Sequence, residues 1–389
     1  MLLFFQKILY SLKYNNFFFR AKIFFYSQLQ KKIFLPFIYF LHKNKNLKLD
    51  YSSGFEKKIL TSINKIYIKK IIKFYHNNFK KNKSIHGIWE ENLQLKFYEF
   101  RKTLLNKNTS KLNLILSNMF RLPITEGLCV GYEHYRNSKN FFGRIYIRTM
   151  FNNYLTELKK KKINLNMIKF QNIGNPSGIK FKKNILSIET LRHANQAFTM
   201  TELTSNIKKP KILEIGGGLA GNCYQYMYTF NKNKKIDYYL VDILEVLIMA
   251  GFFLQKSRGL VFLDNSHKKK LTERNIFLVP KDNFNLIKNI KFDLVFNSCS
   301  LSELDIKDCT KYEKFINDHT KKNSIFYHIN HDLKITYENK NNRSVNKIGS
   351  EIMSKFNKFK LIKKYKRRNN LPEDKLFKYN EFIFKKVKN

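Results

Sequence analysis

The chain has 389 residues, of which 43% are hydrophobic and 15% are aromatic. This length and composition exclude a disordered chain and leave room for two or three domains, each with its own core. The formal net charge of +45 suits anionic partners, but residues that A/T-rich codons specify (Lys, Asn, Ile, Phe and Tyr) are abundant together. We therefore favour nucleotide composition as the source of the charge and keep nucleic-acid binding as the alternative.

The cysteines and the apolar runs bear on location. The chain has four cysteines and no CxxC pair, which argues against a disulfide framework and a zinc site and suits a reducing cytosol. The longest apolar run near the N-terminus, Ile33–Leu41, contains Pro36 and is too short to span a bilayer. We therefore expect a cytoplasmic protein and predict no metal site.

Residues 1–53 alternate aromatic clusters with lysines. Such a segment can pack its aromatic stripe on the domain behind it, which we favour, or lie as a basic amphipathic helix on an anionic membrane. Peripheral membrane contact through residues 1–50 therefore stays open. Residues 54–204 place apolar residues at three- and four-residue spacing, as in Ile59–Phe79 and Leu93–Leu105, which predicts a mainly helical domain that caps the substrate.

Three polar segments of this helical domain precede the domain that follows and could cover its site. They are GLCVGYEHYR at 127–136, GNPSG at 174–178 and LRHANQAFTM at 191–200. If they fold over the site, they supply His134 as a candidate general base, together with side chains that bind the substrate. The substrate-binding residues predicted in these segments are Tyr132, Asn175, Arg192 and His193.

Between residues 205 and 389, apolar strands alternate with helices, which predicts an α/β domain with a parallel, doubly wound sheet. The strands are predicted at 211–215, 237–242, 275–280, 292–298 and 324–330. The helices are predicted at 219–230, 244–256, 301–304, 312–319 and 347–356. The last two strands, 359–366 and 378–387, have no helix between them, so they must pair as an antiparallel hairpin.

A glycine turn follows the first of these strands. Gly216, Gly218 and Gly221 have the GxGxxG spacing, which lets the backbone approach a ligand closely and aims free N–H groups at it. Dinucleotide dehydrogenases use this turn for a pyrophosphate, and class I methyltransferases use it for S-adenosylmethionine. Glu214, before the first glycine, suits the ammonium group of S-adenosylmethionine and would be unfavourable beside a pyrophosphate. Together with the hairpin and the single set of parallel strands, it favours a Rossmann-like class I methyltransferase sheet that binds S-adenosylmethionine.

The ends of the strands predict the site residues. Asp242, at the end of the second strand, is expected to accept from the ribose hydroxyls, and Asp282, after the third, is expected to contact the adenine amino group. The predicted cofactor site consists of Glu214, Gly216, Gly217, Gly218, Gly221, Asp242, Ile243, Asp282, Asn297 and Ser298. Besides His134, the candidate general bases are Glu303 and His331, and Asn330 is a further acceptor-binding residue.

Four segments resemble a family of bacterial sugar O-methyltransferases. They are EIGGGLAG at 214–221, YYLVDILEVLIMAGFFL at 238–254, FDLVFNSCSLSEL at 292–304 and FYHIN at 326–330. The resemblance departs at Ala220, where glycine is usual, and at Cys223. It implies transfer of a methyl group from S-adenosylmethionine to a hydroxyl of a sugar, a nucleotide sugar or a polysaccharide.

Two other functions stay open. An RNA methyltransferase fits the net charge, but NSCS at 297–300 stands where amino-directed nucleic-acid enzymes carry an (Asn/Asp)-Pro-Pro-aromatic motif. The second alternative is a non-catalytic protein that binds the cofactor or a partner. Glu214, the three glycines and Asp242 argue against it, because a degenerate fold has no need of them.

Overall fold

The computed structural model describes residues 48–49, 62–79, 89, 94–128, 131–169, 171–181, 184–257, 259–263, 272–339, 342–366 and 379–388. The predicted membrane contact through residues 1–50 lies outside these residues, apart from Lys48–Leu49. Within the described ranges, no helix combines the length and the apolar character needed to cross a membrane.

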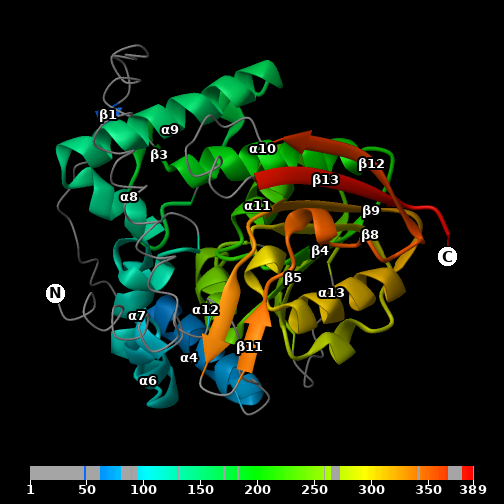
Figure 1. Cartoon of the computed structure of the whole chain (residues 1–389). Helices are drawn as coiled ribbons and strands as arrows, with labels where there is room; N and C mark the ends of the chain where they lie inside the picture. Colours follow the sequence, from blue (N-terminus) through cyan, green and yellow to red (C-terminus); the bar gives the residue numbers. More distant parts are fainter. Residues whose placement is uncertain are drawn as a thin grey trace.

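An eight-stranded sheet has the strand order β12-β13-β9-β8-β4-β5-β7-β6 (Figure 1). Its strands are β4 (Lys211–Ile215), β5 (Ile236–Asp242), β6 (Leu260–Phe262), β7 (Arg274–Pro280), β8 (Phe292–Ser298), β9 (Thr320–His331), β12 (Phe359–Lys366) and β13 (Tyr379–Lys386). The strands from β9 to β6 in this order are parallel, whereas β13 is antiparallel to both of its neighbours, β9 and β12. The predicted fold, a parallel sheet that ends in an antiparallel hairpin, is confirmed.

The parallel strands β4, β5, β6, β7 and β8 form because most of their residues are apolar and both faces of the sheet are covered. Successive side chains point to opposite faces, so Ile212 belongs to one apolar cluster and Leu213 to the other. The first cluster also contains Ile68 and Leu112 from the N-terminal helices. The second contains Cys309 and Ile316 from α13 (Ile306–Asp318).

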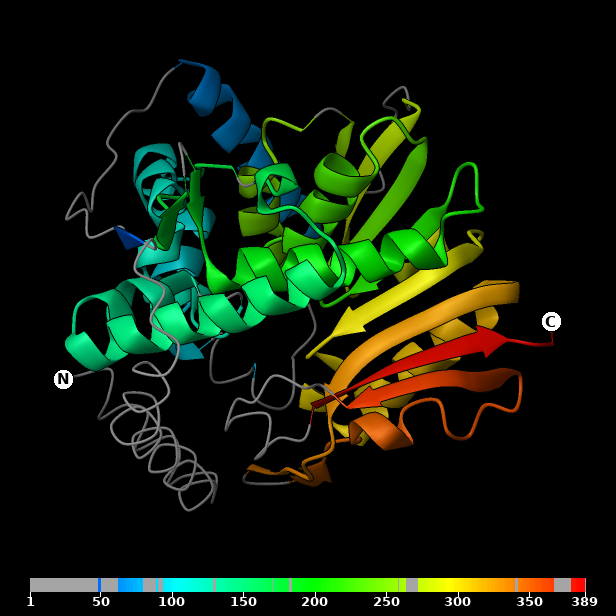
Figure 2. The ribbon, with the colours of Figure 1, turned by 90° about the horizontal axis from the view of Figure 1, so that it is seen from above.

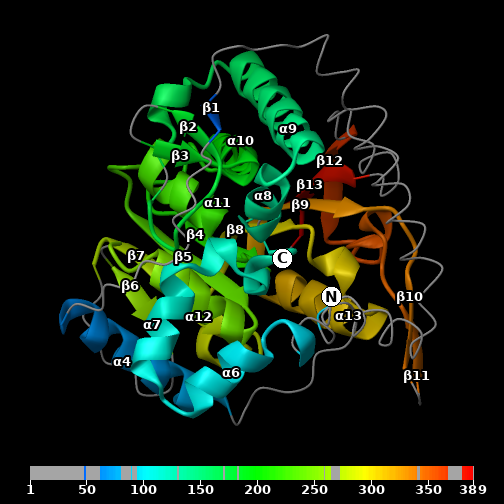
Figure 3. The ribbon, with the colours of Figure 1, turned by 90° about the vertical axis from the view of Figure 1, so that its left-hand side faces the viewer.

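Helices from both halves of the chain surround the sheet. The N-terminal ones are α4 (Ser62–Phe79), α6 (Tyr98–Leu105), α7 (Thr109–Ser117), α8 (Gly131–Ser138), α9 (Phe141–Lys160) and α10 (Ile188–Leu203). Helix α4 packs on α6, α7 and α12 (Leu244–Phe253) at one end of the molecule (Figure 3), and α9 and α10 lie side by side over the sheet (Figure 2). The mainly helical character predicted for 54–204 agrees with these elements, and the division into domains stays a prediction.

Several short elements were not predicted. β6 adds a three-residue parallel strand to the edge of the sheet, and β10 (Thr336–Asn339) pairs with β11 (Asn342–Val345) as a separate hairpin. A separate three-stranded sheet has β2 (Ile179–Phe181) at its centre, paired antiparallel with β1 (Lys48–Leu49) and with β3 (Asn184–Leu186). Strands this short bury too few residues to leave a periodic signal in the sequence.

Two predicted helices take other forms. The helix predicted at 219–230 is a short α-helix, α11 (Gly221–Tyr224), followed by the π-helical segment η5 (Gln225–Phe230). The helix predicted at 347–356 is only a 3₁₀ turn, η8 (Gly349–Glu351). The helix predicted at 312–319 begins earlier, as α13, because Asp305 accepts a hydrogen bond from the backbone N–H of Asp308 and caps it.

Candidate active site

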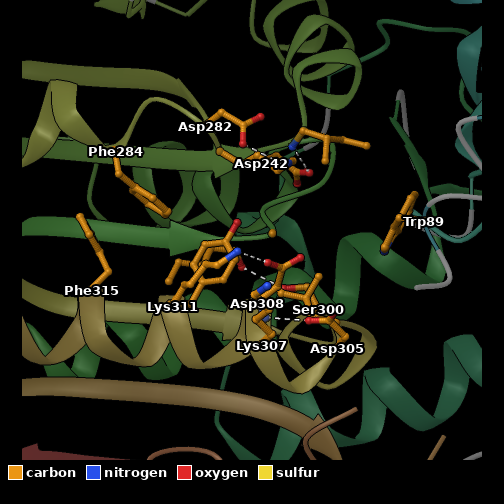
Figure 4. Close-up of a pocket in the computed structure, with 16 residues that line it drawn as sticks. Trp89, Asp242, Asp282, Phe284, Ser300, Asp305, Lys307, Asp308, Lys311 and Phe315 are labelled. Atoms are coloured by element: carbon orange, nitrogen blue, oxygen red, sulfur yellow. Dashed lines mark hydrogen bonds and ion pairs between the residues drawn. The ribbon is translucent and has the colours of Figure 1, made fainter. Parts of the chain in front are cut away.

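A cavity of about 430 Å³ lies at the carboxyl ends of the parallel strands, beside the start of α13. It is lined by Trp89, Ile215, Gly216, Asp242, Ile243, Lys281, Asp282, Phe284, Ser300, Leu304, Asp305, Lys307, Asp308, Lys311, Tyr312 and Phe315. Trp89 and Phe315 lie at opposite ends of the group (Figure 4). Ligands of open α/β sheets bind at this edge, and the volume falls within the range of about 300–1,000 Å³ that small-molecule sites occupy.

The glycine turn forms one wall of the cavity. Gly216 has a φ of 68°, and a Cβ built on it would lie 2.1 Å from Ser300 Oγ, so only glycine fits there. Gly221 opens α11 against the imidazole of His193, which would lie 2.0 Å from an added Cβ. Ala220 adopts a left-handed φ of 62°.

Asp242 is held by the turn itself. Its Oδ2 accepts a hydrogen bond of 2.8 Å from the Gly218 N–H, and its Oδ1 accepts one of 2.7 Å from the Ile243 N–H. Burial raises the pKa of Asp242 to about 7, although both hydrogen bonds lower it. An ionised carboxylate has about four acceptor sites, so it can still accept from a ligand in the cavity.

Glu214 lies behind the cavity wall. It is 1% exposed, and its carboxylate accepts hydrogen bonds from Tyr238 Oη (2.7 Å) and Asn222 Nδ2 (3.1 Å). Burial, and to a smaller extent the charge of Asp242, raise the pKa of Glu214 to about 7, although its two hydrogen bonds lower it. Gly217 is packed closely against this carboxyl and Leu240. Glu214 therefore braces the turn, and the direct contact with an ammonium group stays a prediction.

Glu303 lies in the 3₁₀ turn η7 (Leu301–Glu303), after β8. Its Oε2 accepts a 3.0 Å hydrogen bond from the indole Nε1 of Trp89, which lines the cavity. Burial raises the pKa of Glu303 to about 7, the Trp89 hydrogen bond and Arg192 lower it, and Asp242 raises it. Three carboxyl groups with raised pKa values thus surround the glycine turn.

Asp282, which follows β7, also lines the cavity. Its carboxylate forms a 3.0 Å ion pair with Lys281. Four predicted cofactor residues, Gly216, Asp242, Ile243 and Asp282, therefore line one cavity. Asp308 and Lys311 of α13, which also line it, form a second ion pair of 2.6 Å (Figure 4).

Asn297 and Asn330 join strands and do not face the cavity. Both are fully buried. Asn297 Nδ2 donates to the Ile215 carbonyl at 2.8 Å, and its Oδ1 accepts from Asn330 Nδ2 at 2.8 Å. The side-chain oxygen of Asn330, Oδ1, accepts hydrogen bonds from the backbone N–H and the hydroxyl of Ser302. These hydrogen bonds hold β4, β8 and β9 together, and the predicted contacts of Asn297 with cofactor and of Asn330 with acceptor stay predictions.

The α10 residues lie over the turn. Arg192 forms a 2.5 Å ion pair with Glu189 on the same helix, and its charge also acts on Glu303. His193 contacts Gly221, and burial followed by the charge of Arg192 keeps its pKa well below the usual value. Gln196 reaches Ser298, whose hydroxyl accepts from the amide at 3.2 Å. This helix does cover the site, as predicted for Arg192 and His193, and their contact with an acceptor stays a prediction.

Two of the predicted general bases serve other parts of the fold. His134 is fully buried in α8, and its Nε2 accepts from the Ile188 N–H at the start of α10. His331, the last residue of β9, accepts from the Leu333 N–H. Burial lowers the pKa of His134 to about 3 and that of His331 to about 4. Neither lines the cavity, and their role as general base stays a prediction.

Two predicted acceptor residues also lie elsewhere. Asn175 is buried with a φ of 56°, and its side chain donates to Asn118 at 2.9 Å while its carbonyl accepts from Arg121. Tyr132 packs beside Tyr135 in α8. The GNPSG loop is therefore a structural turn, because its polar groups are satisfied by residues 118–121.

The sequence did not indicate Trp89 or the α13 wall as parts of the site. Nothing in the sequence places Trp89 beside Glu303. The α13 residues that line the cavity recur at helical spacing, as at Asp308, Lys311, Tyr312 and Phe315. That spacing would have revealed them if the helix had been predicted to begin at Ile306.

No protein-family model matches this chain, and no curated protein matches it. Its structure is similar to an S-adenosylmethionine-dependent methyltransferase from Clostridium acetobutylicum, at 14% identity and a TM-score of 0.35 over 51% of this chain and 92% of that chain. The glycopeptide N-methyltransferase MtfA complexed with S-adenosyl-L-methionine is 11% identical, with a TM-score of 0.35 over 51% of this chain and 94% of its own. The 1,6-didemethyltoxoflavin-N1-methyltransferase of Burkholderia thailandensis is 13% identical, with a TM-score of 0.34 over 50% and 78%. The fold assignment rests on the strand order and not on these likenesses.

Proposed function

We propose that this chain is an S-adenosylmethionine-dependent methyltransferase that methylates a hydroxyl of a sugar or glycan precursor. The observation that carries the proposal is the group of three carboxyls around the glycine turn, Glu214, Asp242 and Glu303, each with a pKa raised to about 7 by burial. S-adenosylmethionine carries a sulfonium and an ammonium cation, which would stabilise the ionised carboxylates. A pyrophosphate at the same turn would be repelled, which argues against a dinucleotide.

The residues present fit this cofactor. Asp242 has acceptor sites left for ribose hydroxyls after its two backbone hydrogen bonds, and Ile243 offers an apolar surface beside it. Asp282 lines the same cavity and can accept from an amino group. The antiparallel β13 between β9 and β12 adds support, because the methyltransferase sheet ends in this way. When bound, the cofactor supplies a methyl group that its sulfonium has already activated.

Proton removal is the task left to the protein. As the hydroxyl oxygen of the acceptor forms its bond to the methyl carbon, the hydroxyl proton must leave, and Glu303 is the carboxyl we assign as its acceptor. A pKa of about 7 keeps a useful fraction of Glu303 ionised at neutral pH while leaving it basic enough to take the proton. Trp89 fixes the position of the carboxylate through its indole N–H.

The sugar hydroxyl as acceptor rests on the family resemblance and on this base. The main alternative is RNA, which the net charge of +45 would suit. We therefore propose a test in two steps. Calorimetry with S-adenosylmethionine comes first, with NAD as the matched control: S-adenosylmethionine should bind and NAD should not. The absence of binding at high excess of S-adenosylmethionine would overturn the proposal.

The second step uses cofactor labelled in the methyl group. Label should pass to nucleotide sugars or polysaccharide and not to RNA. Transfer to RNA would replace the sugar with a nucleic-acid acceptor and leave the methyl-transfer chemistry in place. A Glu303→Gln variant should keep the shape of the side chain and the affinity for the cofactor while it loses transfer, since the amide cannot take the proton.

A further inference from the structure

We propose that Gln196 of α10, together with Ser298 at the end of β8, binds a hydroxyl of the acceptor and so determines which acceptors are used. The proposal rests on the proposed function. It assigns a role to a residue that no sequence pattern indicated, and it names the chemistry of the group that this subsite takes.

The position of Gln196 is the first argument. Polar side chains recur on one face of α10 at the helical spacing i, i+3, i+4 and i+7. They are Glu189, Arg192, His193 and Gln196. His193 on this face contacts Gly221 of the cofactor turn, and Gln196 contacts Ser298, so the face lies across the turn and the end of β8. An acceptor must meet the cofactor between these two points.

The second argument is an unsatisfied buried atom. The Gln196 side chain is 5% exposed, its Nε2 donates to Ser298 Oγ at 3.2 Å, and its Oε1 has no hydrogen-bond partner in the described part of the chain. Turning the amide over would pair its oxygen with the Ser298 hydroxyl and leave the nitrogen unpaired instead. In either orientation one polar atom remains for a ligand, and buried polar groups are seldom left without a partner.

The chemistry of the pair selects the class of ligand. The amide of Gln196 and the hydroxyl of Ser298 are both uncharged, and each can donate and accept. The nearest cation of the same helix face, Arg192, is engaged with Glu189. A neutral hydroxyl, which also donates and accepts, matches this subsite.

The test measures acceptor use and cofactor affinity separately. Gln196→Leu removes the polar atoms at similar volume, and Thr199→Val on the next turn of α10, where Thr199 binds Lys161, is the matched control. The probes are methyl-labelled S-adenosylmethionine and a panel of UDP-, GDP- and dTDP-linked hexoses. We expect Gln196→Leu to lower kcat/KM for the best sugar about tenfold or more, chiefly through KM, while the Kd for S-adenosylmethionine stays within about twofold. The control should change neither.

A double-mutant cycle with Ser298→Ala tests the pair. If both residues hold one hydroxyl, the combined loss should be smaller than the product of the single losses; losses that multiply would overturn the proposal. So would an unchanged KM, which would mean that Gln196 binds an ordered water only, or an equal loss of cofactor affinity. If Gln196→Leu does not fold, Gln196→Met, whose unbranched side chain has a similar length and no amide, replaces it with the same readouts.

Failure of the two proposals can be told apart. If the wild-type protein does not bind S-adenosylmethionine, the proposed function fails. If it binds the cofactor and methylates none of the sugars, the acceptor subsite is overturned and the cofactor assignment stands.

Discussion

The raised pKa of Asp242 predicts that cofactor binding depends on pH. Asp242 accepts from ribose hydroxyls much more strongly as a carboxylate than as a neutral acid, and its pKa in the free protein is about 7. A group with this pKa is about one-tenth ionised at pH 6 and about nine-tenths ionised at pH 8, so the affinity should be about tenfold weaker at pH 6. The sign follows from the raised pKa: the ionised form is lost as pH falls below about 7. Binding at pH 7 should release about half a proton from Asp242, and further protons from Glu214 and Glu303.

Calorimetry in two buffers of different ionisation enthalpy measures both quantities at once. The Kd for S-adenosylmethionine is followed from pH 6 to 8, and the difference in heat between the buffers gives the protons released. Asp242→Asn should bind weakly with a flatter pH dependence, while Asp318→Asn, which alters an exposed carboxylate at the other end of α13, should behave like the wild type. An equal Kd at pH 6 and pH 8 with no proton release would refute the reasoning.

Two further predictions concern contacts of the site. Trp89→Phe keeps an aromatic ring but removes the hydrogen-bond donor that lowers the pKa of Glu303. The acidic limb of the pH–rate profile should therefore move to higher pH by as much as about one unit. A limb that does not move would exclude Glu303 as the base. Gly221→Ala places a methyl group against His193, so thermal unfolding should show a loss of about 1–3 kcal/mol. Adding His193→Ala should restore much of that stability without restoring transfer, and no recovery would contradict the steric explanation.

Most strands of the large sheet were predictable because they are rich in apolar or aromatic residues and alternate with helices or turns. The predictions at 211–215 and 359–366 agree with β4 and β12 residue for residue. β6 and the β10–β11 hairpin were not predictable, since three- or four-residue strands depend on the neighbour they pair with more than on their own sequence. The helix at 347–356 was wrong because apolar spacing alone does not show that Ile352 and Met353 pack into the core as an irregular turn.

The candidate site also contains residues that the sequence could place and contacts that it could not. Gly216, Asp242 and Asp282 were placed correctly at the cavity because each follows a parallel strand, and the ends of such strands meet at one edge. Contacts between distant segments could not be read from one sequence. The hydrogen bond from Trp89 to Glu303 spans 214 residues, and the partner of His134 lies at the start of α10.

The influence of Glu214 on a ligand at the turn does not depend on direct contact with it. The sequence argument placed its carboxylate against the ammonium group of the cofactor, but Tyr238 and Asn222 hold it behind the wall. Its electrostatic effect does not require contact, because charges act over several ångströms where water is excluded. Asp242 already raises the pKa of Glu214 and of Glu303, so the three carboxyls interact through a shared low-dielectric region. A cation at the turn relieves that repulsion and an anion adds to it, so the preference for S-adenosylmethionine over a pyrophosphate is a property of the group rather than of Glu214 alone.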